Sequence, residues 1–226
     1  SITKHYRVGE IDVPAIQQVS FSIETASFVA LVGPSGSGKT TLLNMVGCLD
    51  RADAGRLVLL DTEVGRLSRR QRAIFRGEHL GFIFQDFNLM PVLTAYENVE
   101  YPLLLVQSRP PAERKQRVME VLEAVGMAEH KDKYPDQLSG GQKQRVAVAR
   151  ALVTTPKLVL ADEPTANLDS KTSQDIIALM RKMRDTFETT FLFSTHDSRL
   201  VEAVDIIHNL TDGRITETRP VERADA

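Results

Sequence analysis

The chain has 226 residues, of which 42% are hydrophobic and 26% are charged, so its composition is that of a globular protein with an ample core. Its 28 Lys and Arg residues nearly balance 30 Asp and Glu residues, for a formal net charge of −2. This balance argues against bulk binding to nucleic acid or anionic lipid. One cysteine, Cys48, supports neither an internal disulfide nor a zinc cluster. Lacking a long apolar stretch or a signal-peptide pattern, the chain is expected to be soluble and cytosolic.

Strand-like runs alternate with helix-like runs along most of the chain, which predicts an α/β fold. Residues 19–23 alternate apolar and polar side chains and predict a half-buried strand. Continuous apolar runs predict buried strands at 28–32, 57–60, 80–84, 158–161, 191–193 and 205–210. Thr211-Asp212-Gly213 then predicts a turn into a second, polar strand, so the chain should end in a hairpin.

Apolar residues at helical spacing predict helices between these strands. One follows Pro110-Pro111, another follows Asp169 as N-cap, and a third opens at the capping-box pattern of Thr94 to Glu97, with an interruption expected at Pro102. Residues 86–155 are rich in helix and are predicted to form an inserted α-helical subdomain. The five arginines between 66 and 76 predict a solvated helix face, and residues 219–226 a frayed polar tail.

A phosphate-binding loop is predicted directly after the buried strand at 28–32. The run from Gly33 to Thr40 matches G-x-x-x-x-G-K-[ST] and precedes a helical run at 41–48. Its glycines let successive backbone N–H groups converge on phosphate oxygens, at the positive end of a helix. Lys39 is expected to reach the β- and γ-phosphates. The residues assigned to this site are Gly33, Pro34, Ser35, Gly36, Ser37, Gly38, Lys39, Thr40 and Thr41.

Two carboxylates follow the predicted strand at 158–161 and complete the chemistry that a phosphate loop needs. Asp162 is expected to hold Mg²⁺ through water, together with the Thr40 hydroxyl. Glu163 stands one residue further out, where it could polarise an attacking water as general base.

Residues 138–152, Leu-Ser-Gly-Gly-Gln followed by a helical run, resemble the signature motif of ATP-binding-cassette (ABC) ATPases. The other family motifs stand in the expected order: a Q-loop at Gln85, a D-loop ending at Asp169, and a switch histidine at His196. The resemblance covers the whole chain. It implies a P-loop NTPase fold with a RecA-like core, an N-terminal antiparallel β-subdomain and the inserted α-helical subdomain, all in one nucleotide-binding domain over residues 1–226.

The resemblance also implies roles for individual residues, with ATP and Mg²⁺ as cofactors. Glu163, His196 and Lys39 would be catalytic, Gln85 would touch Mg²⁺, and Tyr6 would stack on adenine. The signature would close over ATP held by a second subunit in a head-to-tail homodimer. The residues assigned to ATP binding in trans are Ser139, Gly140, Gly141, Gln142 and Asp169.

Among ABC ATPases, the segments at 47–50, 80–91 and 93–99 resemble the lipoprotein-releasing (Lol) and macrolide-export (MacB) group. This resemblance implies a peripheral subunit on the cytoplasmic face of the bacterial inner membrane, driving an integral permease with a large periplasmic domain. No direct nucleic-acid contact is expected. The partner's helix should dock on an apolar patch at Phe87, Leu89, Met90, Leu93 and Tyr101. Two alternatives stay open: a soluble ABC switch acting on a cytosolic or nucleic-acid partner, and a cell-division ATPase of the FtsE type.

Overall fold

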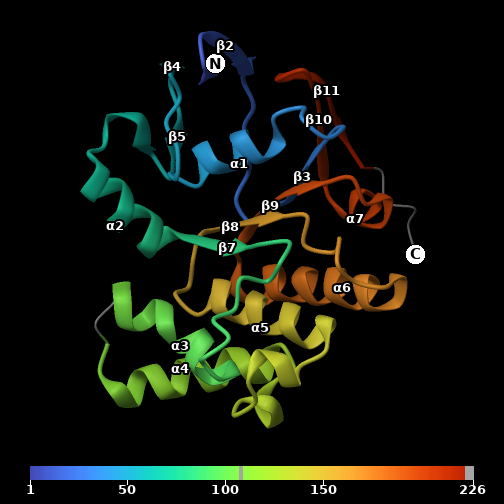
Figure 1. The fold of residues 1–226 in the computed structure, drawn as a ribbon. Helices are drawn as coiled ribbons and strands as arrows, with labels where there is room; N and C mark the ends of the chain where they lie inside the picture. The colour runs from blue at the N-terminus through green and yellow to red at the C-terminus, as the bar shows by residue number, and fades with distance from the viewer. Residues whose placement is uncertain (107–108, 222–226) are drawn as a thin grey trace.

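The computed structural model describes residues 1–106 and 109–221. Its centre is a six-stranded sheet in the order β11–β10–β3–β9–β8–β7, parallel except for the terminal hairpin β10–β11 (Figure 1). The strands are β3 (Phe28–Val32), β7 (Leu80–Ile83), β8 (Leu158–Asp162), β9 (Thr190–Thr195), β10 (Ile206–Thr211) and β11 (Arg214–Pro220). The predicted α/β class and terminal hairpin are confirmed, because the buried apolar runs pair with one another as parallel strands do.

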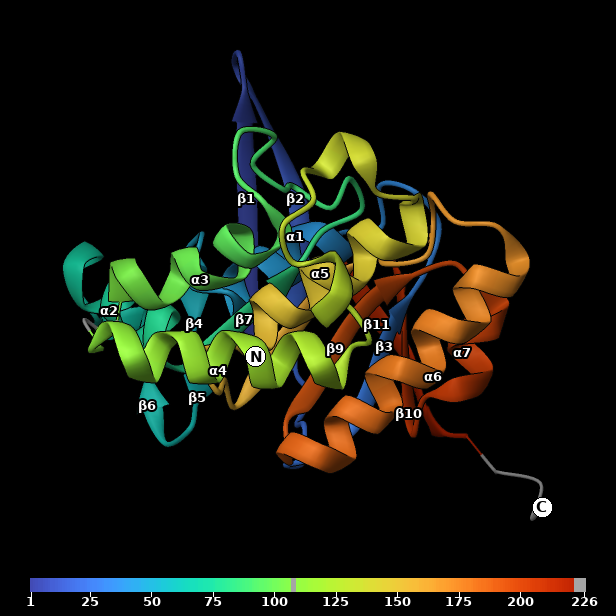
Figure 2. The same ribbon diagram turned by 90° about the horizontal axis from the view of Figure 1, so that it is seen from below.

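Helices cover both faces of this sheet, and each face has its own apolar core. On one face, α1 (Lys39–Val46) and α2 (Arg69–His79) pack their buried residues against Val29, Leu31 and Leu192. The opposite face is covered by the remaining helices, with Phe28, Phe191 and Phe193 at the centre of the core (Figures 1 and 2). These helices are α3 (Ala95–Val106), α4 (Pro111–Ala124), α5 (Gly140–Leu152), α6 (Ser170–Phe187) and α7 (Ser198–Ala203).

A second, antiparallel sheet combines two strands that precede the phosphate loop in sequence with one that follows α1. It has the order β2–β1–β4, and a separate hairpin β5–β6 follows it. The elements are β1 (Ile2–Val8), β2 (Ile11–Val19), β4 (Ala54–Gly55), β5 (Val58–Leu59) and β6 (Thr62–Glu63). Three short 3₁₀ turns complete the described secondary structure, at Val64–Arg66, Ala128–His130 and Pro135–Gln137.

Two strand predictions in this region are wrong. The strand expected at 19–23 is absent: β2 ends at Val19, and residues 20–24 have no regular structure. The alternating pattern is there, but a strand also needs a neighbour to hydrogen-bond, and no described strand pairs with this segment. The buried strand expected at 57–60 is a surface hairpin instead, because Leu60 and Asp61 adopt positive φ and turn the chain back immediately after β5.

Several helix predictions are refined by the structure. α1 begins two residues before the predicted run at 41–48. α3 passes through Pro102 without a break, because Val99 and Leu103 on either side are buried in the core. The arginine-rich α2 is only partly solvated, since Arg72 and Arg76 donate to the carbonyls of Asp50 and Cys48 at 3.4 and 3.1 Å.

The predicted polar tail is partly wrong as well. Residues 219 and 220 pair with β10, and Val221 packs against the core while its N–H donates to the Asp205 carbonyl at 2.9 Å. The rest of the predicted tail, 222–226, lies outside the described residues.

Candidate functional site

The phosphate loop runs from the end of β3 into α1, at the carboxyl edge of the parallel sheet. Gly36 and Gly38 have φ of +79° and +103°, values that residues with a side chain rarely adopt. A side chain at Gly33 would meet the Leu210 carbonyl oxygen at 2.1 Å. Lys39 lies almost wholly buried beneath the loop, where its Nζ donates to the carbonyls of Gly33 and Pro34 at 2.7 and 2.9 Å. The loop thus encircles a single ammonium group.

The predicted metal-binding pair meets across the sheet. The Thr40 hydroxyl, in the first turn of α1, lies 3.2 Å from one oxygen of Asp162 and 3.4 Å from the other, at the end of β8. A hydroxyl and a carboxylate are the hard oxygen donors that Mg²⁺ prefers, and Mg²⁺ is usually held by such a pair together with substrate phosphates. These two residues therefore fit the ion.

Glu163 and His196 form a contact beside this pair. Nδ1 of His196 lies 2.8 Å from Oε1 of Glu163, and the His196 N–H donates to the other oxygen at 3.4 Å. The imidazole is largely exposed, whereas the carboxylate is mostly buried. Glu163 has a φ of +47°, and its N–H donates to the Ser194 carbonyl at 2.9 Å. Glu163 follows β8 and His196 follows β9, so the ends of two neighbouring strands hold the Glu163 carboxylate beside a solvent-exposed imidazole.

Gln85 follows β7 and has an exposed side chain. Its carbonyl accepts from the Asn167 side chain at 3.0 Å, and the same amide donates to Asp86 at 2.9 Å. Asn167 therefore ties the predicted Q-loop to the segment that ends at Asp169. Asn167 was not predicted as a site residue, because nothing in a one-dimensional pattern indicates a partner about 80 residues away.

The signature forms the start of α5, which begins with a capping box. The Ser139 hydroxyl accepts from the Gln142 N–H at 3.3 Å, and the Ser139 N–H donates to the Gln142 side chain at 2.9 Å. α5 covers the sheet face opposite to α1 (Figure 1). No hydrogen bond between described residues joins 139–142 to the phosphate loop, so the structure does not bring these two predicted parts of the site together within one subunit.

Asp169 caps α6. Its carboxylate accepts from the Thr172 hydroxyl at 2.6 Å and from the Thr172 N–H at 3.0 Å, and the bond from the hydroxyl holds the pKa of Asp169 below its usual value. The predicted N-cap is therefore confirmed. Exposure leaves this carboxylate accessible from solvent.

Tyr6 lies in β1 with 38% of its surface exposed. Its hydroxyl donates to Asp50 at 2.8 Å, and the Lys4 ammonium sits 5.2 Å from the ring centroid. Burial and the hydrogen bond to Asp50 both raise the pKa of Tyr6. The ring is thus anchored at its hydroxyl and remains accessible to solvent.

Three further residues support the site and were not predicted from the sequence. The buried Gln144 side chain donates to the Pro164 carbonyl at 2.7 Å, which joins the signature helix to the residue after Glu163. The Thr165 hydroxyl donates to Asp197 at 2.7 Å. Although burial alone would raise the pKa of Asp197, hydrogen bonds from Arg199 and Thr165 hold it below its usual value. The only indication in the sequence was position, because each of these residues lies within two residues of a predicted motif residue along the chain.

Comparison with known proteins agrees with this geometry. A family model described as ABC transporter matches residues 16–166, about two thirds of the chain. The chain belongs to the ABC transporter family. It is an ABC ATPase, with the fold that the signature predicted.

Individual relatives of this ABC ATPase are similar over nearly all of the chain. The lipoprotein-releasing system ATP-binding protein LolD of Francisella tularensis subsp. tularensis is 43% identical over 95% of the chain and 93% of the relative. The macrolide export ATP-binding/permease protein MacB of Rhodopirellula baltica is 42% identical, but the chain spans only 32% of its length. A dimeric post-hydrolysis structure of the cassette MJ0796 with ADP and Pi has a TM-score of 0.89, with 38% identity over 98% of this chain and 97% of that one.

Proposed function

We propose that the protein is the ATP-hydrolysing subunit of a bacterial inner-membrane transporter of the lipoprotein-release or macrolide-export type. The similarity to LolD over 93% of that protein supports the assignment to this group. The MacB relative carries a permease in its name, which supports an integral membrane partner, here with the large periplasmic domain that the Lol/MacB resemblance implies. Among the described residues, no helix is both long and apolar enough to cross a membrane. We place the protein on the cytoplasmic face of the inner membrane, peripheral and held by that partner.

The observation that carries hydrolysis is the 2.8 Å contact between Glu163 and His196, at the sheet edge that also holds the phosphate loop. Glu163 accepts a proton from the attacking water, and His196 holds the carboxylate in orientation. The N–H groups of the loop and Lys39 bind the phosphates. Thr40, Gln85 and Asp162, the last through water, would hold Mg²⁺, which when bound neutralises phosphate charge. Tyr6 stacks on adenine.

We further assign a head-to-tail homodimer in which each signature completes the site of the other subunit. The free N–H groups at the start of α5 form an anion-binding helix terminus, and this terminus has no hydrogen bond to its own phosphate loop. The dimeric MJ0796 cassette supports the arrangement. Residues 86–155 act in it as the α-helical subdomain of a single nucleotide-binding domain.

We place the docking face for the permease on the exposed part of the predicted patch and on the helix that follows it. Leu89 packs against the core, and Phe87, Met90 and Leu93 are half-buried. Val92, in the loop that holds the predicted patch, is 78% exposed, and a stripe of exposed apolar side chains continues on α3: Tyr101, Leu104 and Leu105 are 39%, 48% and 66% exposed. Spacing of three and four residues places them on one helix face, which suits an amphipathic helix of the partner.

The test is capture of the partner from detergent-solubilised membranes of the native host, with tagged Glu163→Gln protein and ATP. We expect an integral membrane protein with a large periplasmic domain to co-purify. Leu104→Glu with Leu105→Glu should abolish capture and leave hydrolysis by the otherwise wild-type subunit within about two-fold, because these side chains are exposed. Ile11→Glu, at a residue 70% exposed on β2, is the matched control and should not affect capture. Recovery of nucleic acid or of the homodimer alone would contradict the transporter assignment.

A further inference from the structure

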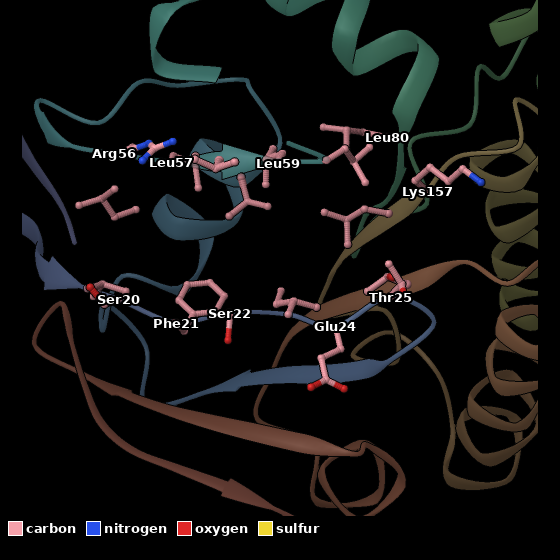
Figure 3. Close-up of a pocket in the computed structure, with 18 of the residues that line it drawn as sticks. Ser20, Phe21, Ser22, Glu24, Thr25, Arg56, Leu57, Leu59, Leu80 and Lys157 are labelled. Carbon is pink, nitrogen blue, oxygen red and sulfur yellow. The ribbon is translucent and has the colours of Figure 1, made fainter. Parts of the chain in front are cut away.

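A cavity of about 720 Å³ lies away from the nucleotide site that the motifs define. Figure 3 shows Phe21 facing Leu57 and Leu59 across it, and the residues that line it include neither Tyr6 nor any residue of the phosphate loop. Tyr6 is instead an exposed residue of β1. Because an exposed ring is not fixed by surrounding walls, its direction depends on the few contacts that the ring itself makes.

The segment at residues 50–53, which follows α1, is bonded to β1. The Asp53 N–H donates to the Thr3 carbonyl at 2.9 Å, and the His5 N–H donates to the Asp53 carboxylate at 2.7 Å. Backbone pairing between β1 and β4 ends at Thr3. Side chains of the 50–53 segment therefore continue the connection along β1 where the sheet stops.

Lys4 is the centre of this connection. It is only 9% exposed, and a buried ammonium needs acceptors for its protons. It donates to Asp50 at 3.1 Å, to Asp53 at 3.3 Å and to the Arg51 carbonyl at 2.9 Å. These acceptors place the ammonium over the Tyr6 ring, 5.2 Å from its centroid and within the range of a cation–π contact. One face of the ring thus lies against Lys4, and the opposite face is the one open to a base.

Asp50 holds the hydroxyl end of the same ring. One carboxylate oxygen accepts from the Tyr6 hydroxyl at 2.8 Å, and the other accepts from Lys4 and from the Arg51 N–H, the latter at 2.6 Å. The Asp50 N–H donates to the Asn44 carbonyl at 3.2 Å, which ties Asp50 to α1, the helix that begins at the phosphate loop. The acceptor of the Tyr6 hydroxyl therefore has a fixed position relative to that loop.

We propose that Asp50 is a positioning residue for ATP, which holds the Tyr6 ring in the direction that the base requires before the nucleotide binds. Stacking then does not have to immobilise a freely rotating side chain, and more of the contact energy appears as affinity. The inference rests on the proposed stacking of Tyr6 on adenine. Asp50 belongs to none of the nucleotide-binding motifs, and its effect is confined to the part of the ATP affinity that the base contributes.

The test separates the base from the phosphates by comparing ATP with inorganic tripolyphosphate, which has no base. Calorimetry in the Glu163→Gln background with Mg²⁺ gives Kd for both without turnover. Asp50→Ala should raise Kd for ATP by about three- to ten-fold, because the ring must then be immobilised on binding. It should leave Kd for tripolyphosphate within about two-fold, because the phosphate loop is unchanged.

Asp53→Ala is the matched control. It removes two bonds of the same segment, those from Lys4 and from the His5 N–H, but it leaves the Tyr6 hydroxyl bonded to Asp50. Both Kd values should stay within about two-fold of the parent protein. Tyr6→Phe removes only the hydroxyl and should weaken ATP binding as Asp50→Ala does. The double variant should bind ATP no more weakly than either single variant, because both changes break one bond. Tm of each variant verifies that it is folded.

Tyr6→Ala distinguishes this inference from the stacking on which it rests. Loss of the ring should raise Kd for ATP by about 5- to 100-fold and leave tripolyphosphate binding unchanged. ATP binding by Tyr6→Ala at the parent affinity would overturn both the stacking and the role of Asp50.

Three other results would overturn the role of Asp50 and leave the stacking standing. The first is weaker ATP binding in Tyr6→Ala with unchanged binding in Asp50→Ala. The second is equal weakening of ATP and tripolyphosphate binding by Asp50→Ala, since the cause would then be a general loosening of the fold. The third is an additive effect of Asp50→Ala and Tyr6→Phe, since the two groups would then act independently.

Discussion

Glu163 combines an unfavourable backbone conformation with a precise set of contacts. Its positive φ costs on the order of 1 kcal/mol for a residue with a side chain, and the bonds to Ser194 and His196 compensate. Glu163→Gln keeps these contacts nearly isosteric but removes the proton acceptor. We expect kcat for ATP hydrolysis to fall on the order of 10²- to 10⁴-fold. Steady-state phosphate release measures kcat, and equilibrium titration with a fluorescent ATP analogue should give a Kd within a few-fold of wild type.

Lys39→Ala is the contrasting variant for this prediction. Removing the ammonium from inside the phosphate loop should abolish tight nucleotide binding, since the loop then loses the cation that its carbonyls hold in place for the phosphates. Turnover by Glu163→Gln at the wild-type rate would rule out its role as base. Near-normal ATP affinity of Lys39→Ala would rule out the assignment of this loop as the phosphate-binding site.

Individual residues were predictable to the extent that their chemistry lies in contiguous motifs. Thr40 and Asp162 were expected to meet and do so, because each ends an element that the sequence identifies clearly. Sequence patterns did not predict Gln144, Asn167 or Asp197 as site residues. Their hydrogen-bond partners lie 20 to 82 residues away along the chain, and no spacing rule indicates such pairings.

The terminal hairpin is the element whose stability should depend most clearly on pH. His208 of β10 is buried, its Nδ1 lies 2.8 Å from the Thr218 hydroxyl, and Phe21 packs 4.9 Å from its ring. Burial lowers the pKa of His208 from the ordinary value of 6.5. Below about pH 6.5 the unfolded chain therefore binds a proton that the folded chain excludes, and the free energy of unfolding falls as pH decreases. His208→Leu should reduce that slope in urea unfolding measured from pH 8 to pH 5.

Comparison at pH 8 isolates the packing effect of this substitution, because the imidazole is then neutral in both states. An unchanged slope between pH 7 and pH 5.5 in His208→Leu would contradict the assignment.

The bounds of the buried strands followed the predicted apolar runs closely. β7, β8, β9 and β10 all lie within two residues of their predicted ends, because strands buried on both faces have continuous apolar sequence.

At the scale of the whole molecule, the separation of Ser139 from the phosphate loop predicts that assembly completes the site. Ser139→Arg should leave ATP binding by the monomer intact, since Lys39 and Thr40 belong to α1, which packs on the sheet face opposite to α5. In the Glu163→Gln background with ATP, it should shift the protein from dimer to monomer by light scattering. Ser139→Ala is the matched control: loss of the cap costs about 1 kcal/mol of stability without adding bulk. Loss of ATP binding together with dimerisation in Ser139→Arg would indicate misfolding instead.

Four features could be predicted from the amino-acid sequence alone: the family, the phosphate loop, the acid pair after β8 and the alternation of strands and helices. These features depend on neighbouring residues, whose spacing sets turn geometry and amphipathic faces directly. The tertiary structure was needed to show that residues 20–23 have no described strand partner, that Tyr101, Leu104 and Leu105 form an exposed stripe, and that the signature helix packs on the sheet face opposite to α1. Hydrogen-bond pairing and burial depend on which distant segments meet, and an alternating pattern carries no information about its neighbour.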